Sequence, residues 1–241
     1  MGKKYVRFRQ SRNRPEGSCT MRGKENIMDL AEAIRNRRTI RKYLDKDVPD
    51  ELLVQAFELA RWAPSGGNFQ SWKFLVVKKR EVIRKVADAV QEKVNILADW
   101  PEAREFGETT QKYLKNAAFF REAPVLIAAL SGEYTSIADV ILSKRPKEDP
   151  LTGEMIENRR SAPTSIQQMG GFVAHLLLAF HSMGLGACWM SGPLIAKGEI
   201  EGILKVSEGW NLVAVVPVGF PAERPSAAPR KAVDELVEFV G

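Results

Sequence analysis

Five cations crowd one short segment of the sequence, RNRRTIRK at residues 35–42. They are Arg35, Arg37, Arg38, Arg41 and Lys42. On a helix or its last turn, Arg37 and Arg38 would each share a face with Arg41, and like charges at these spacings destabilise a helix by roughly 0.2–0.5 kcal/mol per pair. A helix C-terminus compensates such a cost through its dipole. A bound anion such as phosphate does so as well, and Thr39 would add a hydroxyl donor to it. The cluster alone favours the two interpretations equally.

A second polar segment, APSGGNFQSW at residues 63–72, has residue types that suit ligand binding. The Gly66–Gly67 pair lets the backbone approach a flat or anionic ligand closely. Ser65 and Asn68 offer hydrogen-bond donors and acceptors. Taken alone, the segment is more typical of a simple connector between a helix and a strand.

The motifs of common catalytic sites are missing from the sequence. It has no Walker A motif, no GxGxxG, no HExxH and no CxxC. Its two histidines, His175 and His181, are six residues apart in an apolar segment, a spacing that suits neither a metal pair nor a nucleophile and base, so we expect structural roles. Cys188 is expected to be an inert core thiol. We therefore predict no catalytic side chain and no metal ligand, and a chain with so few proton-transfer groups either binds without reacting or depends on a cofactor.

The charge of the chain is unevenly distributed. Residues 1–24 hold eight Lys or Arg and one acid, a net charge of +7, whereas the rest of the chain has a net charge of −1, which together give +6. We expect residues 1–26 to be a basic disordered extension, or the product of a start codon assigned too early, with Met21 or Met28 as the true start. A nucleic-acid or membrane-surface arm is the lesser alternative. Because the body is neutral and few aromatics interleave the basic residues, we predict no nucleic-acid partner.

Size and composition favour a single domain in a reducing compartment. The chain has 241 residues, 44% of them hydrophobic and 27% charged, which is ordinary for a soluble globular protein. Since no apolar run reaches the 18 or so residues that span a bilayer and no apolar stretch follows the N-terminal charges, we predict neither a membrane segment nor a secretory signal. Two cysteines without metal-type spacing make the cytoplasm the expected location.

Hydrophobic periodicity predicts an α+β domain over residues 27–241, with a small central sheet wrapped by helices. Expected helices cover residues 27–34, 49–60, 81–97, 109–121, 164–183, 194–206 and 231–240, and expected strands cover 72–77, 125–130, the end of 184–190, and 212–220. The 164–183 segment is apolar nearly all round, which is typical of a central buried helix. Residues 131–162 form a long polar insert, which we expect to be irregular and to be a lid, a binding loop or a disordered segment.

Taken together, the segments resemble the nitroreductase family of flavin-dependent oxidoreductases. The matching blocks are RRTIRKY, APSGGNFQSW, LLLAFHSMGLGACWMSG, VVPVGFPAERP and APRKAVDELV, which occur in order over most of residues 28–240. The resemblance implies a mostly antiparallel sheet and a homodimer that binds FMN at two sites in its interface. It also implies an NAD(P)H oxidoreductase that passes hydride through flavin N5 to a flat electron-poor substrate, such as a nitroaromatic or quinone, by a ping-pong mechanism.

The resemblance also assigns roles to individual residues. Arg37, Arg38 and Thr39 would hold the FMN phosphate and ribityl chain, and Arg41 would reach the N1/O2 edge of the ring. Pro64, Ser65, Gly66 and Asn68 would come from the partner subunit and cover the same flavin. Ser191 and Gly192 would offer a backbone N–H toward N5, and Arg230 would be a second phosphate cation, with Lys231 a less certain helper. Arg35 and Lys42 are left as solvent-facing cations.

The sequence departs from the family pattern in two places. Ser71 stands before Trp72 where the family often has proline, a change that should not affect the turn. The 131–162 insert matches no particular subgroup, so it leaves the substrate open. Two branches of the family are alternatives to a general reductase: one dehalogenates halogenated tyrosines, and the other consumes its flavin.

Overall fold

The protein is an α+β domain, as predicted, built around a four-stranded sheet. The computed structural model describes residues 28–146 and 148–241, so the basic extension predicted over residues 1–26 lies outside the described residues. Strands β1 (Trp72–Val77), β2 (Val125–Gly132), β3 (Gly186–Ala187) and β4 (Trp210–Gly219) are arranged in the order β1-β2-β4-β3, and each neighbouring pair is antiparallel. None of the helices in the described ranges has the length and hydropathy needed to cross a bilayer.

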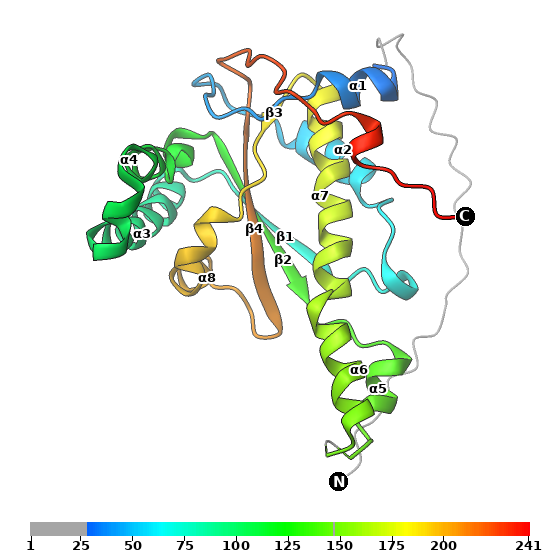
Figure 1. Cartoon of the computed structure of the whole chain (residues 1–241). Coiled ribbons are helices and arrows are strands. Elements are labelled where there is room, and N and C mark those ends of the chain that lie inside the picture. The colour runs from blue at the N-terminus through cyan, green and yellow to red at the C-terminus, as the bar shows by residue number, and fades with distance from the viewer. Residues whose placement is uncertain (1–27, 147) are drawn as a thin grey trace.

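Helices cover both faces of this sheet (Figure 1). The α-helices are α1 (Leu30–Asn36), α2 (Asp50–Ala60), α3 (Arg80–Asp99), α4 (Gly107–Asn116), α5 (Ile137–Leu142), α6 (Pro150–Ser161), α7 (Thr164–Ser182) and α8 (Lys197–Leu204). Short 3₁₀ turns are η1 (Gly66–Asn68), η2 (Pro101–Phe106), η3 (Phe119–Glu122), η4 (Gly192–Ala196) and η5 (Val233–Glu235). One face of the sheet packs against α2 and α7, and the other against α3 and α8.

Strand β2 shows how the sheet separates two cores. Its alternate residues Ile127 and Ala129 join the cluster under α7, whereas Leu126 and Ala128 join the cluster under α3. Successive side chains of a strand point to opposite faces, so a continuous apolar run is what a strand covered on both sides requires. The strands predicted at residues 72–77, 125–130 and 212–220 are therefore confirmed; the inner strands β2 and β4 are buried, and the edge strand β1 is half-buried.

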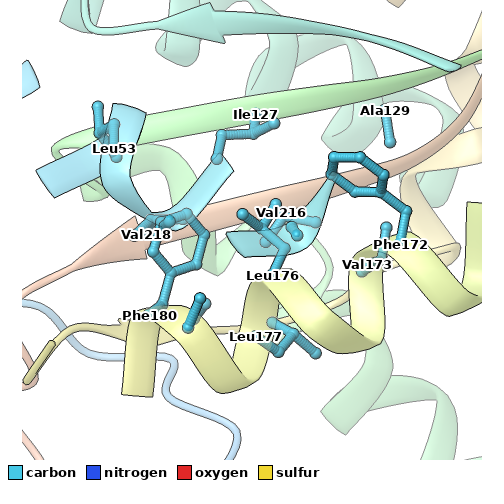
Figure 2. Close-up of a cluster of buried hydrophobic side chains, with 14 of the residues drawn as sticks. Leu53, Ile127, Ala129, Phe172, Val173, Leu176, Leu177, Phe180, Val216 and Val218 are labelled. Atoms are coloured by element: carbon cyan, nitrogen blue, oxygen red, sulfur yellow. The ribbon is translucent and has the colours of Figure 1, made fainter. Parts of the chain in front are cut away.

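The α7 helix supplies the centre of the first core. Phe172, Leu176 and Phe180 project from one face of α7 toward Val216 and Val218 of β4 (Figure 2). These five side chains are all at most 2% exposed. Burial of this kind contributes roughly 1.5–3 kcal/mol for each large apolar side chain, so α7 is fixed firmly along the sheet.

The predicted central helix is confirmed as α7, but one of its faces is not buried in the single chain. Its outer face carries the small or apolar residues Gly171, Ala174 and Leu178, and Ala174 and His175 are exposed. His175 is therefore not a core histidine. His181 lies at the C-terminal end of α7, and its Nε2 is buried without a hydrogen-bond partner in the described part of the chain.

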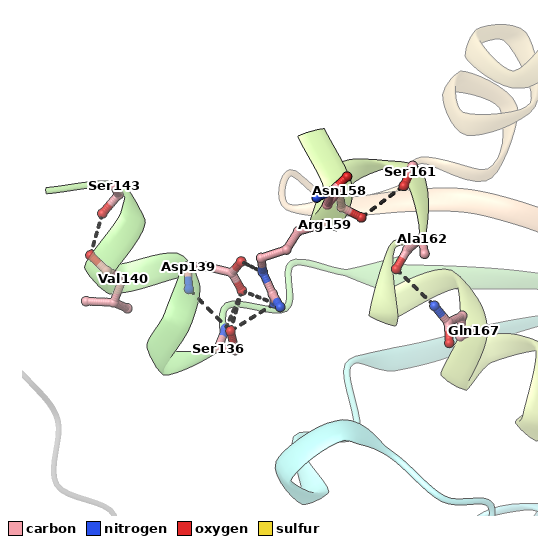
Figure 3. Close-up of polar contacts among 9 residues, drawn as sticks. All are labelled: Ser136, Asp139, Val140, Ser143, Asn158, Arg159, Ser161, Ala162 and Gln167. Atoms are coloured by element: carbon pink, nitrogen blue, oxygen red, sulfur yellow. Dashed lines mark hydrogen bonds and ion pairs between the residues drawn. The ribbon is translucent and has the colours of Figure 1, made fainter. Parts of the chain in front are cut away.

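The 131–162 insert is not the irregular loop that we predicted, because it folds into α5 and α6. Ser136 caps α5 in a capping box with Asp139, and Arg159 of α6 donates to the Asp139 carboxylate and to the Ser136 hydroxyl, 2.9 Å away (Figure 3). This network joins α5 to α6. Polar helices joined by ion pairs show little apolar periodicity, and for that reason the pattern resembled a loop.

Three further helix predictions need correction. The expected helix over residues 109–121 is α4 followed by the separate turn η3, and that over 194–206 is η4 followed by α8. The C-terminal segment 231–240 contains only η5, and its apolar side chains are exposed. Without a surface of the same chain to cover its apolar side, a short amphipathic segment gains little from helix formation.

Candidate functional site

The cationic cluster lies on extended backbone and not on a helix. Helix α1 ends at Asn36, and its C-cap Arg37 has an extended ψ of 131°. Thr39 then bridges Ala187 of β3 in parallel. Side chains of an extended chain alternate, so Arg37, Thr39 and Arg41 share one side. Ile40 is buried on the other. Arg37 and Arg41 do lie on one side of the segment, as predicted. They do so because alternate side chains of an extended chain share a side, and not because of the helical spacing from which we argued.

Arg38 has features of both interpretations that the sequence left open, a cation at a helix C-terminus and an anion-binding group. Its Nη1 donates to the carbonyl oxygens of Arg35 at 2.7 Å and of Arg37 at 3.0 Å, so it satisfies the C-terminal end of α1 as a cation should. It also lines the cavity described next. Arg38 therefore fixes the point where the chain leaves α1, and with it the position of Arg37 and Thr39.

A cavity of about 590 Å³, here called the arginine cavity, gathers most of the predicted cations. Arg37, Arg38, Thr39, Arg41 and Arg230 all line it. Within residues 28–146 and 148–241, the guanidinium groups of Arg37, Arg41 and Arg230 make no ion pair or hydrogen bond. Several uncompensated guanidinium groups around one hollow repel one another unless an anion lies between them. As predicted, Arg35 and Lys42 are exposed, although Arg35 borders the rim.

A neighbouring cavity of about 300 Å³, here called the Trp189 cavity, continues from Arg41. Ser191 and Gly192 line it, as do Tyr113, Asn116, Phe119 and Trp189, which we did not predict. The backbone N–H groups of Ser191 and Gly192 have no acceptor in the described part of the chain, whereas those on either side, of Met190 and Leu194, donate to Val215 and Ser191. Arg41 lines both cavities, so a mainly cationic cavity and a partly aromatic one meet at this residue.

Two buried groups near this site have shifted pKa values. Burial raises the pKa of the Cys188 thiol, an effect that the nearby Arg41 and Arg37 charges oppose. Burial, together with the charges of Arg37 and Arg38, lowers the pKa of His181. Both shifts favour the neutral form of the group, and Cys188 borders the Trp189 cavity.

Glu223 fixes the arginine segment in place. Its Oε1 accepts hydrogen bonds from the backbone N–H groups of Arg41 at 2.6 Å and of Lys42 at 3.1 Å. The Tyr43 hydroxyl donates to the Ile40 carbonyl at 2.7 Å. Sequence reasoning missed both positioning groups, since their partners are backbone atoms and the Glu223 contact spans about 180 residues.

The remaining predicted residues, Pro64, Ser65, Gly66 and Asn68, lie away from both cavities. Gly66 packs against Thr164 at the N-terminal end of α7, whereas the arginine segment lies beside His181 at the other end (Figure 1). At 1.5 Å per helical residue these ends are more than about 20 Å apart. A single chain therefore does not bring these four residues to the arginines.

The Gly66–Gly67 pair also has a role inside its own chain. Gly67 has a φ of +57°, which glycine adopts without strain. A Cβ on Gly66 would lie 2.9 Å from the Tyr134 hydroxyl. The pair is therefore needed to pack η1 against the start of α7 and the segment before α5, whether or not it also approaches a ligand.

Replacing Gly186 by alanine should disturb the site through the fold. A Cβ at Gly186 would lie 2.6 Å from Cγ1 of Ile40, between Thr39 and Arg41, so either β3 or the arginine segment must move. We expect a loss of about 1–3 kcal/mol in the free energy of unfolding, measured by urea denaturation. Gly198→Ala is the matched control, because nothing lies within 4 Å of its Cβ. Equal stability of the two variants would contradict the packing described here.

Comparisons with known proteins identify the class to which this fold and site belong. The sequence profile described as "Nitroreductase family" matches residues 34–220. A protein of Methanothermobacter thermautotrophicus described as a putative NADH dehydrogenase/NAD(P)H nitroreductase is 32% identical over 206 residues, which cover 84% of this chain and 83% of that protein. The chain belongs to the nitroreductase family.

Two solved structures share the fold. A BluB-like flavoprotein from Clostridium difficile 630 has a TM-score of 0.76 and 27% identity, covering 89% of this chain and 100% of the other. An iodotyrosine deiodinase, described as bound to FMN and 3-iodo-L-tyrosine, has a TM-score of 0.66 and 22% identity, covering 88% and 100%. The predicted α+β class with a small antiparallel sheet is confirmed.

Proposed function

We propose that this protein is an FMN-dependent NAD(P)H oxidoreductase that reduces a flat, electron-poor small molecule such as a nitroaromatic or a quinone. One observation carries the proposal: three guanidinium groups without a partner among the described residues line one cavity, and one of them, Arg41, also lines a second cavity with aromatic walls. The family and the flavin-binding neighbours of the same fold support the cofactor.

The donors in the arginine cavity suit a phosphate ester. Arg37 and Arg230 present planar guanidinium groups, which bind phosphate oxygens in pairs. Arg38 and Thr39 line the same cavity and add further donors. The absence of competing carboxylates from the residues that line it leaves these donors free for an anion. We assign these four residues to the phosphate and ribityl end of FMN.

The Trp189 cavity suits the ring of the cofactor. Bound FMN supplies the capacity to accept and release hydride, which the side chains of this chain lack. Arg41 lies at the junction of the two cavities, where a fixed cation stabilises negative charge on the ring edge and so favours its reduction. In this proposal the backbone N–H groups of Ser191 and Gly192, which have no acceptor among the described residues, donate to a ring nitrogen.

A homodimer completes the site in this proposal. Pro64, Ser65, Gly66 and Asn68 cannot reach the arginines of their own chain, so a second copy has to supply them. The uncovered outer face of α7, with Gly171, Ala174 and Leu178, offers close-packing surface for that copy.

A cytoplasmic location remains part of the proposal.

Anaerobic reduction followed by reoxidation tests the activity. We expect NADH or NADPH to bleach the absorbance of bound FMN, and a nitroaromatic or quinone to restore it in a separate second half-reaction. Parallel lines in a double-reciprocal plot would support the ping-pong scheme. A flavin that is reduced but not reoxidised by any such acceptor would contradict general reductase activity.

The similarity to the BluB-like flavoprotein favours a second candidate. In that case the protein uses the same site to bind flavin, which it consumes or applies to a specialised reaction such as reductive dehalogenation. The assignment of Arg37, Arg41 and Arg230 is unchanged. Chromatography of the cofactor during aerobic turnover would distinguish flavin consumption from the first candidate, because only consumption predicts loss of the flavin itself.

A further inference from the structure

A separate cavity of about 590 Å³ lies between the α5–α6 pair and the first turn of α7. Tyr134, Arg159, Arg160 and Thr164 are among its lining residues, and none of these lines the arginine cavity or the Trp189 cavity. It adjoins η1, because a Cβ on Gly66 would lie 2.9 Å from both the Tyr134 hydroxyl and Thr164 Cγ2. This cavity, here called the α5–α6 cavity, therefore shares a wall with the loop that we propose covers the partner's flavin.

One wall of the α5–α6 cavity is rigid and electrically neutral. Arg159 donates to both carboxylate oxygens of Asp139 (Figure 3), and this contact holds the pKa of Asp139 well below its usual range. Gln167 Nε2 donates to the Ala162 carbonyl at 2.9 Å and joins the end of α6 to α7. The Asp139–Arg159 pair thus fixes the geometry, and its two charges cancel.

Arg160 leaves the cavity with one uncompensated positive charge. It is exposed, and its guanidinium has no hydrogen-bond or ion-pair partner in the part of the chain that the structure describes. Tyr134 and Thr164 line the same cavity, and their hydroxyls likewise have no hydrogen-bond partner in the described part of the chain. Leu142 and Ile156 add an apolar wall. A cation with hydroxyl donors beside an apolar wall suits an aromatic ring that bears an anionic group.

We propose that the α5–α6 cavity binds a carboxylate on the substrate, so that the preferred substrates are flat electron-poor aromatic acids. This inference rests on the proposed function, because it places the reducible part of the molecule over the flavin beside η1 and its acidic part against Arg160. The α5–α6 pair then selects the substrate without taking part in electron transfer.

The same cation could instead be read as a site for the phosphate of NADPH, since both ligands are anions. Arg160→Gln separates the two sources, with Lys144→Gln as the matched control. Lys144 is an exposed cation close to the end of α5 that does not line the cavity. The substrates are 4-nitrobenzoate and its neutral analogue 4-nitrobenzamide. KM for each is measured on FMN-loaded protein at saturating NADH. KM for NADPH is measured separately, with NADPH as the varied substrate.

We expect Arg160→Gln to raise KM for 4-nitrobenzoate about five- to tenfold, as suits one charge-assisted hydrogen bond at an exposed site. KM for 4-nitrobenzamide, bound FMN and the NADH half-reaction should be unchanged, and Lys144→Gln should have no effect. Equal effects on the acid and the amide, or no effect on either, would overturn the inference. A raised KM for NADPH alone would overturn it in favour of the cofactor phosphate.

A binding measurement separates failure of this inference from failure of the proposed function. The probe is the fluorescence of 2-naphthoate, which is flat, acidic and not reducible, with 2-naphthamide as the neutral control. Binding of 2-naphthoate that Arg160→Gln weakens would support the cavity even in a protein that retains no FMN. Flavin turnover without any Arg160-dependent preference for the acids would leave the proposed function in place and overturn the cavity assignment.

Discussion

Replacing Arg37 by alanine is expected to weaken FMN binding about ten- to a hundredfold, which corresponds to the roughly 1.5–3 kcal/mol of a charge-assisted hydrogen bond to an anion. Arg37 is half-buried, lines the arginine cavity and has no partner among the described residues. Its loss should therefore affect the ligand more than the fold. The measurement is a titration of apoprotein with FMN, in which the quenching of flavin fluorescence reports binding.

Lys42→Ala is the control for this experiment. Lys42 belongs to the same cationic segment but is exposed and lines neither site cavity. We expect wild-type FMN affinity for Lys42→Ala and nearly unchanged thermal stability for both apoproteins. Wild-type affinity in Arg37→Ala would show that the arginine cavity does not hold the phosphate.

The largest expected loss of stability follows from Phe172→Ala. Phe172 is 2% exposed, and its ring centroid lies 4.5 Å from that of Phe74 and 4.9 Å from that of Trp72. Removing a buried phenyl ring costs about 3–5 kcal/mol through lost transfer energy and the cavity left behind. We expect a shift of that size in the free energy of unfolding, measured by urea denaturation of the apoprotein.

Phe106→Ala provides the comparison, because the Phe106 side chain is 63% exposed. It should change stability by less than about 0.5 kcal/mol, as surface substitutions usually do. A loss below about 1 kcal/mol in Phe172→Ala would mean that α7 is not the anchor of the core. The arginine segment lies near one end of α7 and η1 near the other. The positions of both segments therefore depend on this packing.

The fold could be predicted largely because its core is strongly patterned. The continuous apolar run at residues 125–130 has no polar face and requires cover on both sides, which the α3 and α7 layers supply. Where local periodicity was weak, prediction failed. The α5–α6 pair is held by the Ser136, Asp139 and Arg159 contacts, which span about 20 residues and leave no periodic pattern.

The site was only partly accessible from the sequence. Arg37, Thr39 and Arg41 were identified by charge density and by resemblance, but the extended backbone that aligns them depends on β3, which comes from a segment about 150 residues later. Tyr113 and Asn116 carry no motif and enter the Trp189 cavity only through the placement of α4. Arg160 could be read as a charge in a polar insert, and its cavity exists only once α6 and α7 meet.

The absorption spectrum of the purified protein tests the central claim most directly. We expect a yellow protein, or an apoprotein that becomes yellow when FMN is added, with flavin bands that stay with the protein through gel filtration and bleach on addition of NADH or NADPH. A colourless protein that takes up no FMN would contradict the assignment of the arginine cavity and the proposed function with it.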